Sequence, residues 1–465
     1  MNNTQRTNNE NLHMTFWGGV GSVTGANFLM ESPRTRILVD CGLLQGSPEA
    51  STENNATFPY DPKTIDYLFV THAHMDHIGK IGKLVKDGFK GIIYSTPETK
   101  ELAHVMILDA LKVMEMNARE SIGDKTQKPL YGAEHVATAF SLWKTIPYHT
   151  DTKLNDEFSV FVMDAGHILG SSMYKFSYGG KRIVFTGDSG NSPTPLLRET
   201  DRIIDADYIV MDSVYGDRNH EPKDERDAKF RRIVTESIGR GGALVIPAFS
   251  LERTQVILYE LNNLVEEKKI PSVPVYLDSP LALKVTDIYK QFTKDFNVGV
   301  QSEIKGGDDL FNFPRLSITH GSRDSHAIED RPNPKIIIAG SGMSSGGRVV
   351  WHEENFLPDP KSTILLMGYQ AVGTLGRRIQ DVPSQVEING KMIPVRARIE
   401  MISGYSSHKD SDNLVRMIED TQETVKKVFV VMGEPKASTY LAQRLQNEAG
   451  VDAIYPERGV IYELE

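Results

Sequence analysis

The sequence predicts an α/β fold in which one domain is interrupted by a second α/β domain. Short apolar runs rich in β-branched residues recur along the chain, and most are followed closely by Asp or His. In the middle of the chain such runs alternate with helical patterns, which is typical of a parallel sheet. The length of 465 residues also exceeds what one hydrophobic core usually organises.

The runs of the first domain are predicted to be buried strands with polar ends. Six of these seven end in Asp or His, whereas a single Asp at a strand exit would be ordinary turn chemistry. Strands that end at one edge of a sheet bring their last residues into one space, so we expect a site built from several strand ends. In chain order the runs are RILVD to Asp40, YLFVTH to His72, FVMDAGH to His167, RIVFTGD to Asp188, YIVMD to Asp212, RIEMISGYSSH to His408 and VFVVM to Met432.

A stretch from about 214 to 394 is predicted to be the insert. Its strands are ALVIPAF (243–249), PVYLD (274–278), KIIIAGSG (335–342) and STILLMG (362–368), and its helices lie near 223–239, 251–268 and 280–293. Helices of the first domain are expected at 97–120 and 132–144. The predicted organisation is therefore a polar tail (1–12), the first part of the first domain (13–213), the insert (214–394) and the second part of the first domain (395–465).

The composition restricts the class of protein. No apolar run approaches the ~20 residues that cross a bilayer, so no membrane partner is expected. A single cysteine, Cys41, excludes an internal disulfide and a cysteine-rich zinc finger, and it suits a reducing cytosol. The net charge of −10 argues against a protein whose whole surface coats nucleic acid, so a polyanion must be bound locally.

The segment His72-Ala73-His74-Met75-Asp76-His77 is the densest cluster of ligand-type residues. His72 and His74 are two apart at the end of an extended run, so their side chains point the same way. Imidazole with carboxylate is the ligand mixture expected for zinc or a similar divalent ion. A lone His is more often structural, but four such residues within six positions predict a metal site.

This His-x-His-x-Asp-His spacing resembles the metallo-β-lactamase superfamily, and the resemblance extends over nearly all the chain. It implies an αββα sandwich that holds two zinc ions. Asp40 matches an acidic residue that orients the metal-bound His from outside the ligand set. The implied ligands are His72, His74 and His167 for the first metal, Asp76 and His77 for the second, and Asp188 as the bridge.

Signatures within and around the insert resemble the β-CASP nucleases, in particular the bacterial and archaeal ribonucleases related to the endonuclease subunit of the pre-mRNA 3′-end machinery. They are Asp212-Ser213-Val214-Tyr215-Gly216, PAFSLERTQ, YLDSPLA, GSGMSSGGR, GYQAVGTLGRR and SGYSSH. The resemblance implies a parallel α/β β-CASP insert, RNA as the partner and substrate, and hydrolysis of phosphodiester bonds. Whether cleavage is internal or proceeds from the 5′ end stays open, as does the oligomeric state, for which a homodimer is one option.

The chemistry of such a site agrees with these implied roles. Two metal ions bind the scissile phosphate and lower the pKa of a water molecule, which leaves a 5′-phosphate product. His408 would give a proton to the leaving oxygen, and Asp212 would orient it. The expected catalytic residues are His408, Asp212, Asp76 and Asp40. The residues expected to contact substrate, in the cleft between the domains, are Arg253, Ser341, Gly342 and Arg348, which follow or begin elements of the insert.

One position departs from the family. The ribonucleases have a His before Gly-Glu after the last strand, whereas this chain has Met432. A thioether suits zinc poorly beside carboxylate and imidazole, so the second metal should bind more weakly and should tolerate Mn²⁺. In this family an apolar residue here tends to accompany DNA substrates, so a DNA nuclease is one alternative. A non-catalytic subunit that binds RNA or protein and a small-molecule hydrolase are the others.

Overall fold

The computed structural model describes residues 11–46, 49–120 and 128–465. The chain forms two compact units. The first comprises Met1–Ser192, Glu199–Asn219 and His408–Glu465, and the second comprises Pro193–Arg198 and His220–Ser407. Most of the predicted polar tail lies outside the described residues, but its last position, Leu12, already belongs to the first strand. Within the described ranges no helix has the length and apolar character needed to cross a membrane.

The first unit contains two sheets, each with seven strands among the described residues. One sheet has the order β22 (Ile461–Leu464), β1 (Leu12–Gly18), β2 (Asn27–Glu31), β3 (Arg36–Val39), β4 (Tyr67–Phe69), β5 (Ile92–Ser95) and β6 (Trp143–Thr145). The other has the order β21 (Ala453–Ile454), β20 (Lys427–Val431), β11 (Tyr208–Asp212), β10 (Lys181–Phe185), β9 (Ser172–Tyr178), β8 (Phe158–Asp164) and β7 (Asp151–Lys153). Strands from both ends of the chain therefore complete this unit.

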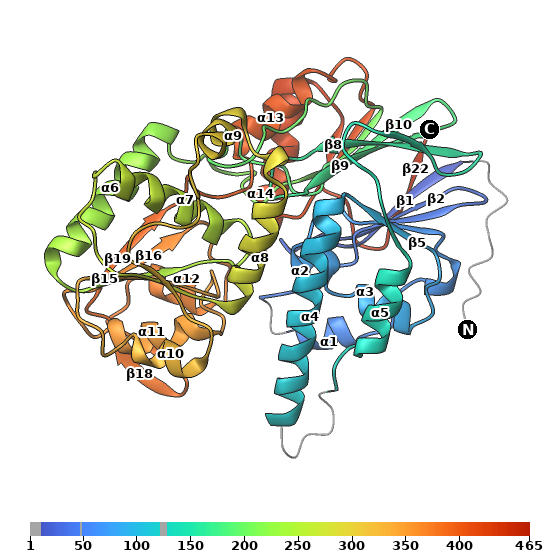
Figure 1. The fold of residues 1–465 in the computed structure, drawn as a ribbon. Helices are drawn as coiled ribbons and strands as arrows, with labels where there is room; N and C mark the ends of the chain where they lie inside the picture. Colours follow the sequence, from blue (N-terminus) through green and yellow to red (C-terminus); the bar gives the residue numbers. More distant parts are fainter. Residues whose placement is uncertain (1–10, 47–48, 121–127) are drawn as a thin grey trace. The chain divides into compact units, whose positions relative to one another are not determined.

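The two sheets face each other across one hydrophobic core. Phe16, Phe28 and Phe69 from the first sheet pack with Phe176 and Phe185 from the second. The helices cover the outer faces, and Figure 1 shows the four layers in succession. The predicted αββα sandwich is confirmed. On the side of the first sheet lie α1 (Ala50–Asn55), α2 (Met75–Ile78), α3 (Ile81–Lys86), α4 (Pro97–Glu120) and α5 (Ala133–Ser141), and on the second lie α13 (Ser411–Glu419) and α14 (Pro435–Arg444).

The second unit is built on a parallel sheet, as predicted. Its strand order is β14 (Leu316–Ile318), β13 (Val275–Asp278), β15 (Lys335–Ala339), β12 (Ala243–Pro247), β16 (Thr363–Met367) and β19 (Arg398–Ile402). Its other elements are α6 (Lys223–Arg240), α7 (Arg253–Glu266), α8 (Pro280–Gln291), α9 (Val298–Lys305), α10 (Ser322–Ala327), α11 (Arg348–Phe356), α12 (Leu375–Gln380) and a hairpin of β17 (Gln385–Ile388) and β18 (Lys391–Pro394). The central strands are buried along their whole length, which explains their unbroken apolar sequences.

Strand β19 differs from the sequence-based expectation. The sequence pattern groups the run RIEMISGYSSH with the strands of the first domain, but β19 pairs in parallel with β16 of the insert's sheet. The second unit consequently continues to Ser407, beyond the predicted boundary at 394. A strand of this composition satisfies its backbone equally well at the edge of either sheet, so the sequence pattern alone did not distinguish them.

Several sequence signatures are turns from a strand into a helix. In YLDSPLA, β13 ends at Asp278, the Ser279 side chain accepts a hydrogen bond from the N–H of Ala282, and Pro280 begins α8. In GYQAVGTLGRR, Thr374 caps α12 in the same way. Capping residues at fixed offsets thus account for part of each signature without any catalytic role.

A buried carboxyl group holds the glycine-rich segment that follows β15. Glu353 on α11 is fully buried and accepts a hydrogen bond from Ser344 Oγ at 2.5 Å. Burial raises the pKa of Glu353 from its ordinary value of 4.5 to about 8. The folded protein therefore keeps this carboxyl protonated at neutral pH, whereas the unfolded chain ionises it.

We expect Glu353→Gln to stabilise the protein increasingly as the pH rises. Below pH 4.5 the carboxyl is protonated in both states, and the variant should match the wild type. Between pH 4.5 and about 8 only the unfolded chain ionises, so the wild type loses stability that the amide retains. The gain at pH 8 should be roughly 2–4 kcal/mol, measured by denaturant unfolding.

Glu354→Gln is the matched control, because Lys391 lowers the pKa of this partly buried neighbour and its removal should give no such gain. A Glu353→Gln protein with the same stability difference at pH 5 and pH 8 would contradict a protonated buried carboxyl.

Candidate metal centre

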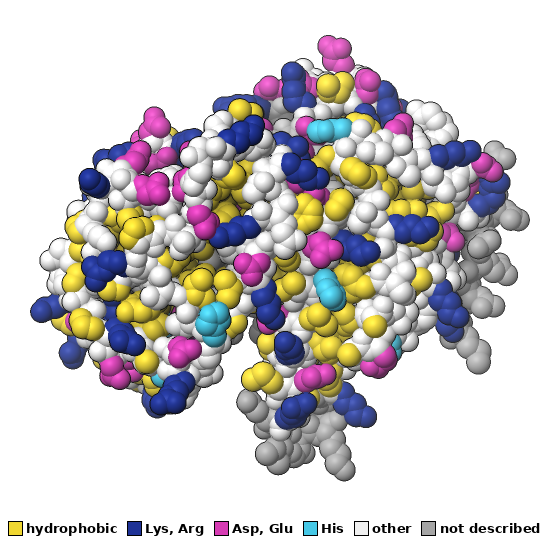
Figure 2. All heavy atoms as spheres, viewed as in Figure 1, with side chains coloured by type: hydrophobic (Ala, Val, Ile, Leu, Met, Phe, Trp, Pro, Cys, Tyr) yellow, Lys and Arg dark blue, Asp and Glu magenta, His cyan; other side chains and the backbone are white. Residues whose placement is uncertain are grey.

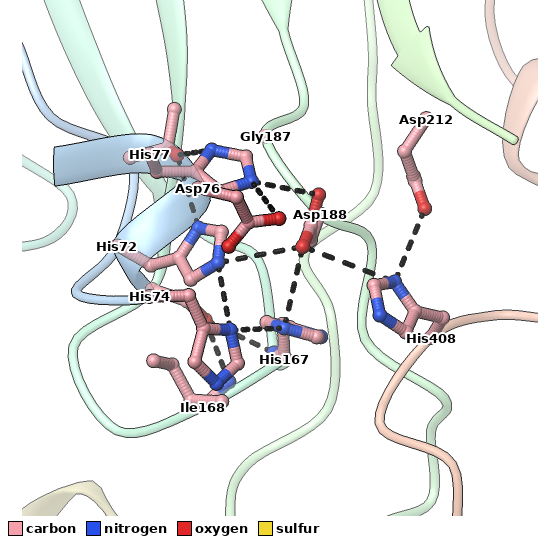
Figure 3. Close-up of polar contacts among 12 residues, drawn as sticks. His72, His74, Asp76, His77, His167, Ile168, Gly187, Asp188, Asp212 and His408 are labelled. Atoms are coloured by element: carbon pink, nitrogen blue, oxygen red, sulfur yellow. Dashed lines mark hydrogen bonds and ion pairs between the residues drawn. The ribbon is translucent and has the colours of Figure 1, made fainter. Parts of the chain in front are cut away.

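The segment after β4 brings two imidazoles together. The strand ends at Phe69, the chain bends at Ala73, and His74 occupies the N-cap position of α2. His72 Nε2 and His74 Nδ1 lie 3.0 Å apart, as their spacing predicts (Figure 3). Asp76 and His77 follow on α2, so one short turn presents four ligand-type side chains.

The opposite sheet supplies the two distant members of the cluster. His167 follows β8 and Asp188 follows β10. His167 Nε2 lies 3.3 Å from His74 Nδ1 and 3.5 Å from Asp188 Oδ2. Asp188 Oδ2 lies 3.4 Å from His72 Nε2, and its Oδ1 lies 3.4 Å from His77 Nε2. Strand ends of both sheets therefore meet, rather than strand ends of one sheet as the sequence pattern suggested.

Asp40 braces the cluster from the end of β3. Its carboxylate accepts hydrogen bonds from the backbone N–H and the hydroxyl of Thr71, both at 2.8 Å. Its Oδ2 also lies 2.7 Å from His77 Nδ1. This contact occupies Nδ1, so the other ring nitrogen of His77 faces Asp188 and Asp76.

The electrostatics differ between the imidazoles, favouring the neutral form at His74 and His167 and the charged form at His77. Burial and the neighbouring rings lower the pKa of His74 and His167 well below the ordinary range. Burial alone would raise the pKa of Asp188, but His77 and His72 lower it well below its usual value. Burial acts to lower the pKa of His77, yet Asp188 and Asp40 raise it well above the ordinary value. Burial also raises the pKa of Asp76.

These donor atoms suit a divalent metal ion. One ligand atom each from His72, His74, His167 and Asp188 lies within 4.8 Å of the others. Within the described residues, His77 Nε2 and Asp188 Oδ1 are buried yet make no hydrogen bond of good geometry. Ring nitrogens and a carboxylate packed this closely and shielded from water are costly unless a cation binds them. The arrangement therefore fits the imidazole and carboxylate coordination of zinc.

His408 and Asp212 form the adjoining part of the site. His408 Nδ1 lies 3.6 Å from Asp212 Oδ2 and 3.9 Å from Asp188 Oδ2. Burial opposes a charge on His408, but Asp212 and Asp188 together raise its pKa. Asp212 also accepts the N–H of Ser189 at 3.0 Å, which ties it to the residue after Asp188. The ring therefore favours its protonated form beside the metal ligands.

Two residues outside the predicted set support these side chains. The Thr71 hydroxyl lies between Asp40 and His72, 3.1 Å from His72 Nδ1. Lys409 donates from Nζ to the carbonyl of Gly190 at 2.5 Å, and its backbone N–H donates to Ser189, beside the bridge that pairs Gly190 with His408. In the sequence, Thr71 and Lys409 are distinguished only by standing next to a His. Many residues do so, and this alone does not indicate a role in the site.

The residues predicted to contact substrate lie in the second unit. Arg253 begins α7 and is buried, with its guanidinium near Gly368 at the end of β16. Ser341 and Gly342 follow β15, and Ser341 Oγ accepts the N–H of Ser345 at 3.0 Å. Arg348 begins α11 and donates to Asp278 at 2.6 Å and to the carbonyl of His320 at 3.2 Å. That ion pair favours a structural role for Arg348.

Comparison with protein families divides the chain into three matched regions. Residues 21–214 match the metallo-beta-lactamase superfamily, and residues 254–379 match the Beta-Casp domain. Residues 392–456 match the Zn-dependent metallo-hydrolase RNA specificity domain. The matched regions thus cover both sides of the insert and most of the insert itself.

Proteins from bacteria and archaea are similar to this chain over more than nine tenths of its length. A ribonuclease of Thermus thermophilus is 33% identical over 92% of this chain and 95% of its own length. The transcription termination factor FttA of Methanosarcina mazei is 31% identical over 95% of this chain and 70% of its own length. An RNase J-like protein of Methanocaldococcus jannaschii is 28% identical over 96% of this chain and 99% of its own length. A solved structure of a protein of unknown function from Enterococcus faecalis covers 98% of this chain with a TM-score of 0.56 at 13% identity, which shows a shared fold.

Asp188→Ala should release most of the bound metal while the protein stays folded. The substitution removes the carboxylate that faces three imidazoles, whereas the apolar core between the sheets is unchanged. Metal content by mass spectrometry and a thermal melt together test this. Asp156→Ala, at an exposed acid of the same unit, is the control and should keep its metal. Full metal occupancy in Asp188→Ala would refute the bridging role.

Proposed function

The chain belongs to the β-CASP ribonucleases of the metallo-β-lactamase superfamily, and from this membership we propose that it is a zinc-dependent nuclease that hydrolyses RNA phosphodiester bonds and leaves 5′-phosphate ends. The observation that carries the proposal is the convergence of His72, His74, His167 and Asp188 beside the pair of His408 and Asp212. A multi-histidine cluster and a separate protonated imidazole are the two components that metal-assisted hydrolysis needs.

His72, His74 and His167 would hold one zinc ion, and Asp76 and His77 would hold a second, with Asp188 shared between them. When bound, zinc attracts the phosphate and lowers the pKa of water toward neutrality. Asp40 contributes by fixing the ring orientation of His77 through its 2.7 Å contact with Nδ1. Thr71 supports this arrangement by donating its hydroxyl to Asp40.

His408 would donate a proton to the leaving 3′ oxygen. Burial opposes the charge, but Asp212 and Asp188 raise the pKa of the ring, which favours the protonated form that a general acid requires. Asp212 would orient the ring, since one of its oxygens is held by the N–H of Ser189 and the other faces His408 Nδ1. The proton would come from the imidazole, and the carboxylate would stabilise the charged ring before transfer.

Met432 supports a weaker second metal site. The side chain is buried in the core cluster between the sheets, and it borders a cavity of about 10 Å³ together with Asp40, Thr71, His77 and Gly187. An imidazole at this position would face the same small space as His77. A thioether there is a poor ligand for zinc, and the remaining ligands are mainly oxygen donors, which also suit Mn²⁺.

A DNA nuclease is the second candidate, favoured by the apolar side chain at position 432. Cleavage of end-labelled RNA and single-stranded DNA of matched sequence distinguishes the two, and the product ladder separates internal cutting from trimming at the 5′ end. RNA cleavage that depends on His74 supports the proposal. Cleavage of DNA alone would identify DNA as the substrate in place of RNA. If the metal-loaded protein cleaves neither, the chain would be a non-catalytic subunit that binds RNA or protein.

His408→Ala should lower RNA turnover by roughly 10² to 10⁴ while metal content and RNA affinity are retained. A substrate with a nitrophenolate leaving group needs little protonation, so its hydrolysis should lose much less activity. Single-turnover rates for both substrates provide the measurement. An equal loss for both leaving groups would count against a proton donor at this position.

Met432→His should raise the metal content from nearer one ion per chain toward two. Residue 432 has φ of 51°, a left-handed conformation in which His is enriched relative to most residues, so the backbone tolerates the change. Metal stoichiometry after dialysis is the readout, and Met432→Leu is the control that adds no ligand. A wild-type protein with two tightly bound zinc ions and an unchanged His variant would mean that another group completes the site.

A further inference from the structure

A second pocket lies in the first unit, apart from the metal ligands. Its volume is about 140 Å³, enough for about ten water molecules, so a ligand group of moderate size fits. Its lining combines aromatic rings, two cations and one carboxylate on five separate segments of the unit. The residues are Trp17, Asn27, Glu53, Ala56, Thr57, Phe58, Pro59, Lys80 and Arg458.

The charges of the pocket are unbalanced toward positive. Lys80 is largely buried, and its ammonium makes no hydrogen bond or ion pair with any residue that the structure describes. Arg458 is paired with Glu53 at 2.8 Å, and the nearby Lys83 is paired with Asp87 at 2.6 Å. Burial lowers the pKa of Lys80, and Arg458 adds to this shift. A partly buried ammonium that faces an aromatic ring and no carboxylate at ion-pair distance is incompletely compensated, and a bound anion would compensate it.

The walls of the pocket suit a flat aromatic group. Phe58 lies 5.7 Å from Lys80 Nζ and 4.4 Å from Lys83 Nζ, measured to its ring centroid. The Trp17 indole N–H is buried and has no acceptor within the described part of the chain. Arg458 Nε donates to the Trp17 carbonyl at 3.0 Å, which holds the guanidinium at the rim. Phe58 also stacks on Tyr60, with ring centroids 5.4 Å apart, so an aromatic pair lies beside the cations. An inorganic anion would use the cations alone.

The backbone connects this pocket to the metal-binding turn. Lys80 follows His77 by three residues, and its N–H donates to the carbonyl of Cys41 at 2.9 Å, next to Asp40. Ala26, beside the lining residue Asn27, donates to the carbonyl of Asp76 at 2.9 Å. The same short turn therefore contributes to both sites, which suits two sites that bind one ligand strand.

We propose that the pocket binds one nucleotide of an RNA strand, with its phosphate at Lys80 and Arg458 and its base against Phe58 or Trp17. The identity of the strand rests on the proposed ribonuclease function, whereas the nucleotide chemistry follows from the pocket itself. Base stacking on aromatic side chains combined with cationic contacts to phosphate is the general mode of single-strand binding.

Equilibrium binding to the full-length protein tests the proposal, with adenosine 5′-monophosphate, adenosine, inorganic phosphate and a short single-stranded RNA as probes. Lys80→Gln should weaken binding of the monophosphate and of RNA by roughly tenfold, the usual worth of a charge-assisted contact. Phe58→Leu should weaken the monophosphate and adenosine about fivefold or more and leave phosphate unchanged. Lys80 is the N-cap residue of α3, and Lys86 is the last residue of that helix and lies outside the pocket. Lys86→Gln, which removes a charge there, should bind all four probes like the wild type.

Equal binding of the monophosphate to Lys80→Gln and Lys86→Gln would overturn the pocket assignment, and so would phosphate that binds as tightly as the monophosphate. If Lys80→Gln weakens binding of the monophosphate but not of RNA, the pocket binds a free nucleotide and not a nucleotide of an RNA strand, which would overturn that part of the proposal. Lys86→Gln should hydrolyse a small nitrophenyl phosphodiester at the wild-type rate. A protein that cleaves no RNA but loses nucleotide binding in Lys80→Gln would refute the proposed function and leave the nucleotide site standing.

Discussion

The carboxylate of Asp188 is the group on which the site depends. It is buried at the end of β10 and faces His72, His77 and His167 from one side and His408 from the other. A single buried anion surrounded by imidazoles requires either protons or a cation among the rings, because the low dielectric of the interior makes an uncompensated charge expensive. The same carboxylate therefore links the proposed metal-binding residues with the proposed proton donor, and its position couples the two sheets.

Packing between the two sheets fixes the positions of the ligand-type side chains. The apolar residues between the sheets hold β4 and β10 in fixed relation, so that the chain segments leaving them meet at one edge. Close backbone approach reinforces the meeting, since a Cβ on Gly190 would lie 2.0 Å from the carbonyl of Gly166, next to His167. Asp40 and Thr71 then set ring orientation by hydrogen bonds. Packing places the ligands, and the polar contacts orient them.

Charge distribution reconciles a net charge of −10 with a polyanionic substrate. A uniformly basic surface is unnecessary when cations are concentrated where the phosphate binds. Bound metal ions would provide one such concentration at the His and Asp cluster, and Lys80 with Arg458 in the second pocket would provide another. The second unit instead uses Arg348 internally, against the buried Asp278, so a basic residue after a strand is not by itself evidence of substrate contact.

The sequence by itself determined the α/β class, the insert and the metal-binding segment, because strand and helix periodicities and the density of His and Asp are local properties of the chain. It also placed the ligand-type residues His167, Asp188, Asp212 and His408 at strand ends. Only the tertiary structure decided that the turn with His72 leaves one sheet whereas the strand ends before His167, Asp188 and Asp212 belong to the facing sheet. It also decided that β19, which precedes His408, joins the sheet of the insert, and that Thr71 and Lys409 brace the site. The sequence also could not predict the pocket around Lys80, since its lining includes residues as far apart in the chain as Trp17 and Arg458. Contacts between segments far apart in the chain depend on packing, and packing has no periodic signature.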